Sequence, residues 1–106
     1  MRESDIERYL VRKVKASGGE VRKVKWVGRD GAPDRLVMLP KPWGNSSFPL
    51  HQTIWVELKR PGKAATFPAD AHERKQHREH ERMRKMGQRV EIIDSIEGVD
   101  RLLGGV

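Results

Sequence analysis

Residues 53–59 read Thr-Ile-Trp-Val-Glu-Leu-Lys, a period-two pattern that is typical of a β-strand with one buried face. Alternate residues of a strand point to opposite faces of the sheet, so Ile54, Val56 and Leu58 are expected to join the core. Four side chains share the opposite face: Thr53, Trp55, Glu57 and Lys59. The strand therefore places a carboxylate and an ammonium group side by side, next to an aromatic ring.

Helix caps, apolar spacing and turn residues locate the other predicted elements. A Ser4–Glu7 capping box begins the first helix, Asp70 caps a long charged helix, and Gly87 ends that helix. In chain order the elements are a helix at 4–16, a strand at 21–27, a strand at 35–39, a loop at 40–52, the strand at 53–59, a helix at 70–85, a strand at 90–94 and a helix at 95–103. The almost wholly apolar strand at 35–39 is expected near the centre of the sheet. This order predicts one α/β domain over residues 1–106, with a small mixed sheet of about four strands flanked by helices.

Composition restricts the possible functions. The 106 residues include 22 Lys and Arg against 15 Asp and Glu, which gives a formal net charge of +7 with four neutral His. An excess of positive charge favours a polyanionic partner such as nucleic acid. The absence of Cys excludes disulfides, zinc ribbons, iron–sulfur clusters and thiol nucleophiles. No segment is typical of a secretory signal or a membrane span, so we expect a cytoplasmic protein without a membrane partner.

Two isolated acids stand out in the middle of the chain. Between residues 31 and 69 the only carboxylates are those of Asp34 and Glu57. Mg²⁺ and Mn²⁺ prefer carboxylate and carbonyl oxygens, which these two side chains and the backbone carbonyl of Leu58 could supply. Lys59 could orient or deprotonate an attacking water and stabilise a phosphodiester transition state. The pattern therefore predicts a metal-dependent nuclease site.

These residues resemble the PD-(D/E)XK nucleases and, among them, the VRR-NUC domain, from Ser4 to about Ser95. The matching positions are Glu7 in the opening helix, Gly31-Ala32-Pro33-Asp34, Glu57-Leu58-Lys59, and Gln76 in the charged helix. The resemblance implies a restriction-endonuclease-like core, dependence on Mg²⁺ or Mn²⁺, and endonuclease activity on DNA. It also implies that Glu7 assists through a bound water or a second metal, and that Gln76 positions the substrate or Lys59.

The same resemblance bears on assembly and location. Small stand-alone members of the family, commonly encoded by phages, resemble homodimers that act on branched DNA such as four-way (Holliday) junctions. An exposed apolar loop around Trp43, Phe48 and Leu50 and the small apolar content of the chain also favour a homodimer. A phage-encoded protein of this kind is expected in the host cytoplasm.

Each candidate also has a purely structural interpretation. Asp34 follows Pro33 in a turn, where Asp is favoured for its hydrogen bond to the backbone. Glu57 and Lys59 could form an ordinary surface ion pair, and Glu7 could serve only the capping box. Gln76 is unremarkable in a charged helix without the family match. Two other functions therefore stay open, a non-catalytic nucleic-acid-binding module and, less favoured, a protein-interaction domain.

Basic residues and histidines complete the candidate nucleic-acid interface. The predicted DNA contacts are Arg12, Lys13, Lys63, Arg74, Lys75, Arg78 and Arg82. His72 or His80 is expected to reach phosphate beside Gln76. A zinc site is disfavoured because His77 and His80 form one helical pair without further ligands, and an HNH nuclease is disfavoured for want of a suitably placed His.

The tryptophans receive separate predictions. Trp26 is expected in the core and Trp55 beside the site, where it could pack against a base. Trp43 is expected in a dimer or DNA contact.

Overall fold

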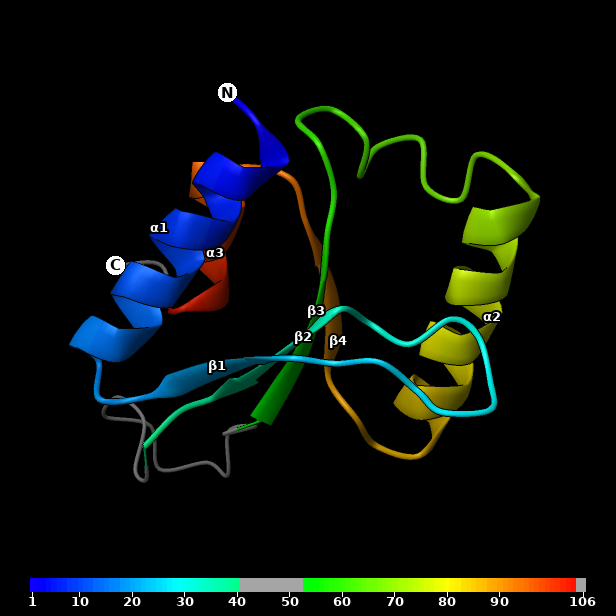
Figure 1. Cartoon of the computed structure of the whole chain (residues 1–106), viewed down its shortest axis with the longest axis horizontal. Helices are drawn as coiled ribbons and strands as arrows, with labels where there is room; N and C mark the ends of the chain where they lie inside the picture. The colour runs from blue at the N-terminus through cyan, green and yellow to red at the C-terminus, as the bar shows by residue number, and fades with distance from the viewer. Residues whose placement is uncertain (41–52, 105–106) are drawn as a thin grey trace.

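The structure is a computed structural model that describes residues 1–40 and 53–104 of the chain. Seven helices and strands occur in these ranges, in the order that the sequence predicts (Figure 1). They are α1 (Glu3–Ala16), β1 (Glu20–Lys23), β2 (Arg35–Met38), β3 (Thr53–Leu58), α2 (Ala71–Lys85), β4 (Val90–Ile93) and α3 (Ile96–Leu102). The loop at 40–52, with Trp43, Phe48 and Leu50, lies almost wholly outside the described residues.

The four strands form one mixed sheet in the order β1-β2-β3-β4. β1, β2 and β3 pair antiparallel, whereas β3 and β4 pair parallel with α2 as the connection between them. α1 and α3 cover one face of the sheet and α2 stands on the other (Figure 1). The predicted α/β class, the mixed four-strand sheet and the central place of β2 are confirmed.

The two faces of the sheet differ in chemistry. Towards α1 and α3 the core is apolar, and Ile54, Val56 and Leu58 belong to it as predicted. Towards α2 the buried side chains are mostly polar, namely Glu57, Gln76, Glu79 and His80. Buried polar groups need partners, because an unsatisfied one costs about 1–3 kcal/mol. The sheet face towards α2 is therefore less stable than an apolar face would be, which is typical of a functional site.

The ends of α2 and α3 follow the predicted signals. The Asp70 carboxylate accepts the backbone N–H of Glu73 at 2.8 Å and so caps α2. Gly87, just beyond α2, has a φ of 84°, which favours glycine at a helix end. The Ser95 hydroxyl accepts the N–H of Gly98 at 2.9 Å at the start of α3.

The start of α1 differs from the prediction. Its N-cap is Arg2, whose backbone N–H donates to the Asp5 carboxylate at 2.8 Å, so the Ser4–Glu7 capping box is wrong. Ser4 lies inside the first turn and is exposed. The Asp5 carboxylate can reach the backbone N–H of the N-cap because Asp5 lies three residues after Arg2, the spacing of a capping box. The Glu7 side chain is thereby free to make contacts elsewhere.

Strand β1 is shorter than the predicted 21–27. It ends at Lys23, which pairs with Arg35, and one further backbone bond joins Val24 to Asp34. Because β2 itself begins at Arg35, residues after Val24 have no neighbouring strand to pair with. The chain therefore leaves the sheet there, and Val27 is fully exposed. Trp26 is therefore half-buried rather than in the core.

None of the helices in residues 1–40 and 53–104 combines the length and the apolar character needed to cross a bilayer.

Candidate active site

Asp34 and Glu57 meet at the junction of β2 and β3. Arg35, the first residue of β2, is paired with Val56, so Asp34 lies beside the end of β3. The Asp34 Oδ1 atom accepts the backbone N–H of Leu58 at 3.1 Å. The two isolated acids of the sequence are thus brought together by antiparallel pairing.

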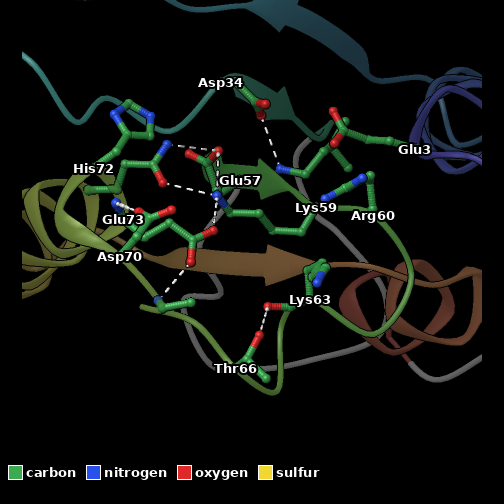
Figure 2. A pocket seen from close by; sticks show the side chains of 13 residues that line it. Glu3, Asp34, Glu57, Lys59, Arg60, Lys63, Thr66, Asp70, His72 and Glu73 are labelled. Atoms are coloured by element: carbon green, nitrogen blue, oxygen red, sulfur yellow. Dashed lines mark hydrogen bonds and ion pairs between the residues drawn. The ribbon is translucent and has the colours of Figure 1, made fainter.

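A pocket of about 420 Å³ opens where these acids lie (Figure 2). Side chains from α1, the turn before β2, strand β3, the segment after it, and α2 line this pocket. Four predicted site residues are among them: Asp34, Glu57, Lys59 and Gln76. Leu58 also lines the pocket, and so does Lys63 from the predicted DNA contacts.

The environment of Asp34 disfavours a negative charge. Burial and the nearby Glu57 carboxylate raise the pKa of Asp34 to about 6, and Glu3 adds to this effect. The Leu58 N–H and the Arg35 guanidinium oppose it without cancelling it. A cation between the two carboxylates would offset their mutual repulsion and so stabilise both in the charged form.

Glu57 is almost fully buried, at 4% exposure, and its two oxygens differ. Oε2 accepts the amide of Gln76 at 3.3 Å and lies 3.9 Å from the Lys59 ammonium. Oε1 is buried without a hydrogen-bond partner among the described residues. One oxygen is therefore held in place while the other retains unused capacity to accept a ligand.

Lys59 is held by α2 rather than by its strand neighbour. Its ammonium lies 2.9 Å from Glu73 Oε2 and donates to Gln76 Oε1 at 3.0 Å. It also lies over the Phe67 ring, 5.1 Å from the centroid. The simple Glu57–Lys59 surface pair is thus replaced by a largely buried network.

Glu73 is a pocket residue that the sequence interpretation missed. One of its oxygens contacts Lys59, while the other accepts the backbone N–H of Ala69 at 2.8 Å. These two hydrogen bonds lower the pKa of the Glu73 carboxyl. The available signal was its spacing, because Glu73 lies three residues before Gln76 and so shares its helix face.

Two acids of α1, Glu7 and Glu3, lie differently from the prediction, which placed Glu7 at the site and gave Glu3 no role. The Glu7 carboxylate forms an ion pair with the Arg35 guanidinium and does not line the pocket. Glu3, one turn earlier, does line it (Figure 2). Because the sequence interpretation placed the helix start at Ser4, Glu3 was left outside the helix.

Two comparisons with known proteins show the family of this chain. The chain is 39% identical over 95 residues to the "Putative nuclease p44" of Acyrthosiphon pisum secondary endosymbiont phage 1, covering 90% of this chain and 85% of the relative. It also superposes on a solved structure described as a VRR_NUC domain, with a TM-score of 0.69 and 34% identity over 95% of this chain and 92% of that one. This chain belongs to the VRR-NUC nuclease family. No protein-family profile matches it.

The VRR-NUC assignment confirms the restriction-endonuclease-like α/β fold and makes the protein a nuclease. Nucleases of this fold generally use divalent metal ions. Within the described residues no three His, Asp or Glu side chains gather as a metal-binding group. Asp34 and Glu57 offer two neighbouring carboxylates, and Leu58 of the same pocket offers a backbone carbonyl. This set fits Mg²⁺, which keeps several of its waters and binds proteins through one or two carboxylates.

The predicted DNA contacts of the VRR-NUC domain separate into three groups. Lys63 lines the active-site pocket, together with Arg60 and His72 (Figure 2). Three others line a second hollow of about 250 Å³ beside α2, namely Lys75, Arg78 and Arg82. Arg74 is exposed on α2, and Arg12 and Lys13 are exposed on α1 beside the Tyr9 ring.

Two predictions, one for a histidine and one for a tryptophan, are wrong. His80 is fully buried and does not line the pocket, so it does not reach phosphate as expected. Trp26 packs against Trp55, with ring centroids 5.4 Å apart, instead of entering the core. Trp55 is half-buried and donates to Gln88 Oε1 at 2.9 Å.

Gly31 fixes the turn that carries Asp34 against α2. Its φ is 97°, and an added Cβ would lie 2.9 Å from the Glu79 Cβ and 3.0 Å from the Lys75 carbonyl oxygen. Arg29 reinforces the contact through an ion pair with Glu79 at 2.9 Å. The close packing of this turn on α2 therefore explains why the Gly-x-Pro-Asp motif begins with glycine.

Replacing Gly31 by alanine is expected to lower the free energy of unfolding by about 2–4 kcal/mol, because backbone strain and a backbone clash add together. Chemical denaturation measures this change. Gly28→Ala is the matched control, since its φ of 83° imposes the same strain but an added Cβ meets nothing within 4 Å. Equal losses in the two variants would show that the turn does not pack closely on α2.

Proposed function

We propose that this VRR-NUC nuclease is a Mg²⁺- or Mn²⁺-dependent endonuclease that hydrolyses DNA phosphodiester bonds. The observation that carries the proposal is the Asp34–Glu57 pair beside Lys59 in one polar pocket. In a chain of net charge +7, the half-buried Asp34 and the adjacent buried Glu57 would repel a nucleic acid unless a cation lies between them. A binding module gains nothing from such a pair.

Asp34, Glu57 and the Leu58 carbonyl would hold the metal, and Glu3 would act through a bound water. When bound, the metal supplies Lewis-acid polarisation of the phosphate and a more acidic water. In the reaction a water oxygen would bond to phosphorus as the opposite P–O bond breaks, the water's proton would pass to solvent, and the leaving oxygen would take up a proton from solvent. The salt bridge to Glu73 favours Lys59 as a donor to the transition-state charge rather than as the proton acceptor.

The remaining side chains of the pocket would bind and orient the substrate. Gln76 holds both Lys59 and Glu57, and so fixes their relative positions. Lys63, Arg60 and His72 line the same pocket and are suited to adjacent phosphates. Contacts of this kind are independent of base sequence, which supports recognition of DNA by shape and charge.

Branched DNA, such as a four-way junction, is the substrate we propose, and the family resemblance supports it. The homodimer stays a prediction from the sequence, because Trp43, Phe48 and Leu50 lie outside the described residues. The cytoplasmic location likewise stays a prediction.

The test is cleavage of matched linear, flap and four-way DNA by the full chain. We expect products with Mg²⁺ or Mn²⁺, most from the four-way substrate, and none with EDTA. We also expect DNA affinity that falls steeply with salt, since phosphate contacts release counterions. Salt-sensitive binding that is indifferent to divalent ions, without cleavage of any substrate, would instead identify a non-catalytic binding module.

A further inference from the structure

His80 is the most deeply buried titratable side chain of α2. Its exposure is 0%, and neither ring nitrogen has a hydrogen-bond partner among the described residues. A buried polar group left in this state costs about 1–3 kcal/mol, which an apolar residue at the same position would avoid. The fold thus accepts a penalty at His80 that core packing alone does not explain.

The unpaired imidazole faces the unpaired oxygen of Glu57. His80 Nε2 lies 3.7 Å from Glu57 Oε1, which is itself buried and unpartnered. This separation exceeds the usual N–H···O length of about 2.9 Å by roughly 0.8 Å. One small movement of the carboxylate would satisfy both atoms at once.

Neighbouring side chains set the direction of that movement. Gln76, one turn before His80, donates to the other Glu57 oxygen, Oε2. Phe67 stacks on the imidazole with centroids 5.8 Å apart and ring planes 18° apart, which restricts rotation of the ring. The carboxylate of Glu57 is therefore bracketed by two donors from a single helix face.

We infer that His80 is a positioning residue for Glu57, whose Nε2–H donates to Glu57 Oε1 and so orients this carboxylate for a divalent metal. This inference rests on the proposed function. His80 does not line the pocket, so it acts through Glu57 rather than on the substrate. Hydrogen bonds from outer residues to a metal-binding side chain change metal affinity by about 10–100-fold.

The first test measures Mn²⁺ affinity from the thermal stabilisation of the full chain at increasing Mn²⁺ concentration. His80→Met removes the donor at nearly constant size, and His80→Gln keeps an amide donor at the position of Nε2. We expect about 10-fold weaker Mn²⁺ binding for the methionine variant and affinity within about 3-fold of wild type for the glutamine variant. Equal affinities in both variants would overturn the inference.

The second test needs no metal and no activity. Long-range ¹H–¹⁵N correlation spectra of the metal-free chain are expected to show a proton on His80 Nε2 with a hydrogen-bonded shift that disappears in Glu57→Ala. An unprotonated Nε2, or a shift unchanged in that variant, would overturn the inference. Absence of Mn²⁺ binding by the wild-type chain would instead overturn the proposed function, and these spectra would still decide the role of His80.

Discussion

Replacing Lys59 by methionine is expected to lower the rate of DNA cleavage by about 10²–10³-fold. Removing a single preorganised donor to a developing negative charge has an effect of this size, and Lys59 is largely buried at 13% exposure. Methionine preserves the length of the side chain and its contact with Phe67. The loss should therefore appear in the rate at saturating DNA, measured in single-turnover experiments with Mg²⁺.

Lys63→Met is the matched control for Lys59→Met. Lys63 lines the same pocket but is exposed and has no carboxylate partner within ion-pair distance in the described residues. We expect Lys63→Met to weaken DNA binding and to reduce the salt dependence of the affinity by the amount that corresponds to about one lost phosphate contact. The cleavage rate at saturating DNA should change little. A Lys59→Met variant that keeps more than about a tenth of the wild-type rate would remove Lys59 from the chemical step.

The sequence placed Asp34 and Glu57 close together, as they are in the structure, and the reason is geometric. Strand periodicity puts Glu57 and Lys59 on one face, and a turn followed by an antiparallel strand brings Asp34 beside them. Gln76 followed from the family motif, and the structure places its amide on both Glu57 and Lys59. Local patterns and a motif therefore account for the central residues.

The errors arose where two local signals competed. The predicted α1 began with a Ser4–Glu7 capping box, whereas in the structure the backbone of Arg2 and the carboxylate of Asp5 form the cap. The predicted start at Ser4 left Glu3 outside the helix, while the family resemblance, not the helix start, assigned Glu7 to the site. In the structure a long-range ion pair with Arg35 holds the Glu7 carboxylate outside the pocket, and no local pattern reveals that pair.

The contacts that His80 and Glu73 make in the structure were missed in the sequence for a related reason. Their roles depend on how α2 packs over β3, which sets the contacts of Glu73 with Lys59 and of His80 with Glu57. A charged helix with few apolar residues gives little indication of its buried side. The α2 face is polar because it serves the site, so the usual apolar signal for burial is absent there.

Asp34→Asn is expected to abolish detectable cleavage, a loss of about 10³-fold or more, and at the same time to stabilise the metal-free protein at pH 7.5. The amide oxygen can still accept the Leu58 N–H, so the turn is retained. The variant loses the charge that would hold a divalent ion. It also loses a carboxylate that burial and Glu57 hold in an unfavourable environment.

The pH dependence of this gain in stability follows from the pKa of Asp34, which is raised to about 6 in the folded protein from its ordinary value of 3.8. Between these values the folded state binds more protons than the unfolded state, so wild-type stability rises as pH falls from about 6 to 4. A shift of two units corresponds to at most about 3 kcal/mol, and solvent at the 33%-exposed side chain reduces this to about 1–2 kcal/mol. The advantage of the variant should therefore be full above pH 7 and vanish near pH 4.

Thermal melts in EDTA across this pH range measure the effect, with Asp30→Asn as the control. Asp30 lies in the same turn region, but its side chain is 79% exposed, 3.9 Å from Lys75, so we expect little change. In Mn²⁺ the order should reverse, because the ion stabilises only the chain that binds it. A pH-independent difference between wild type and Asp34→Asn would show that Asp34 is an ordinary turn residue, since its charge would then carry no penalty that a metal could relieve.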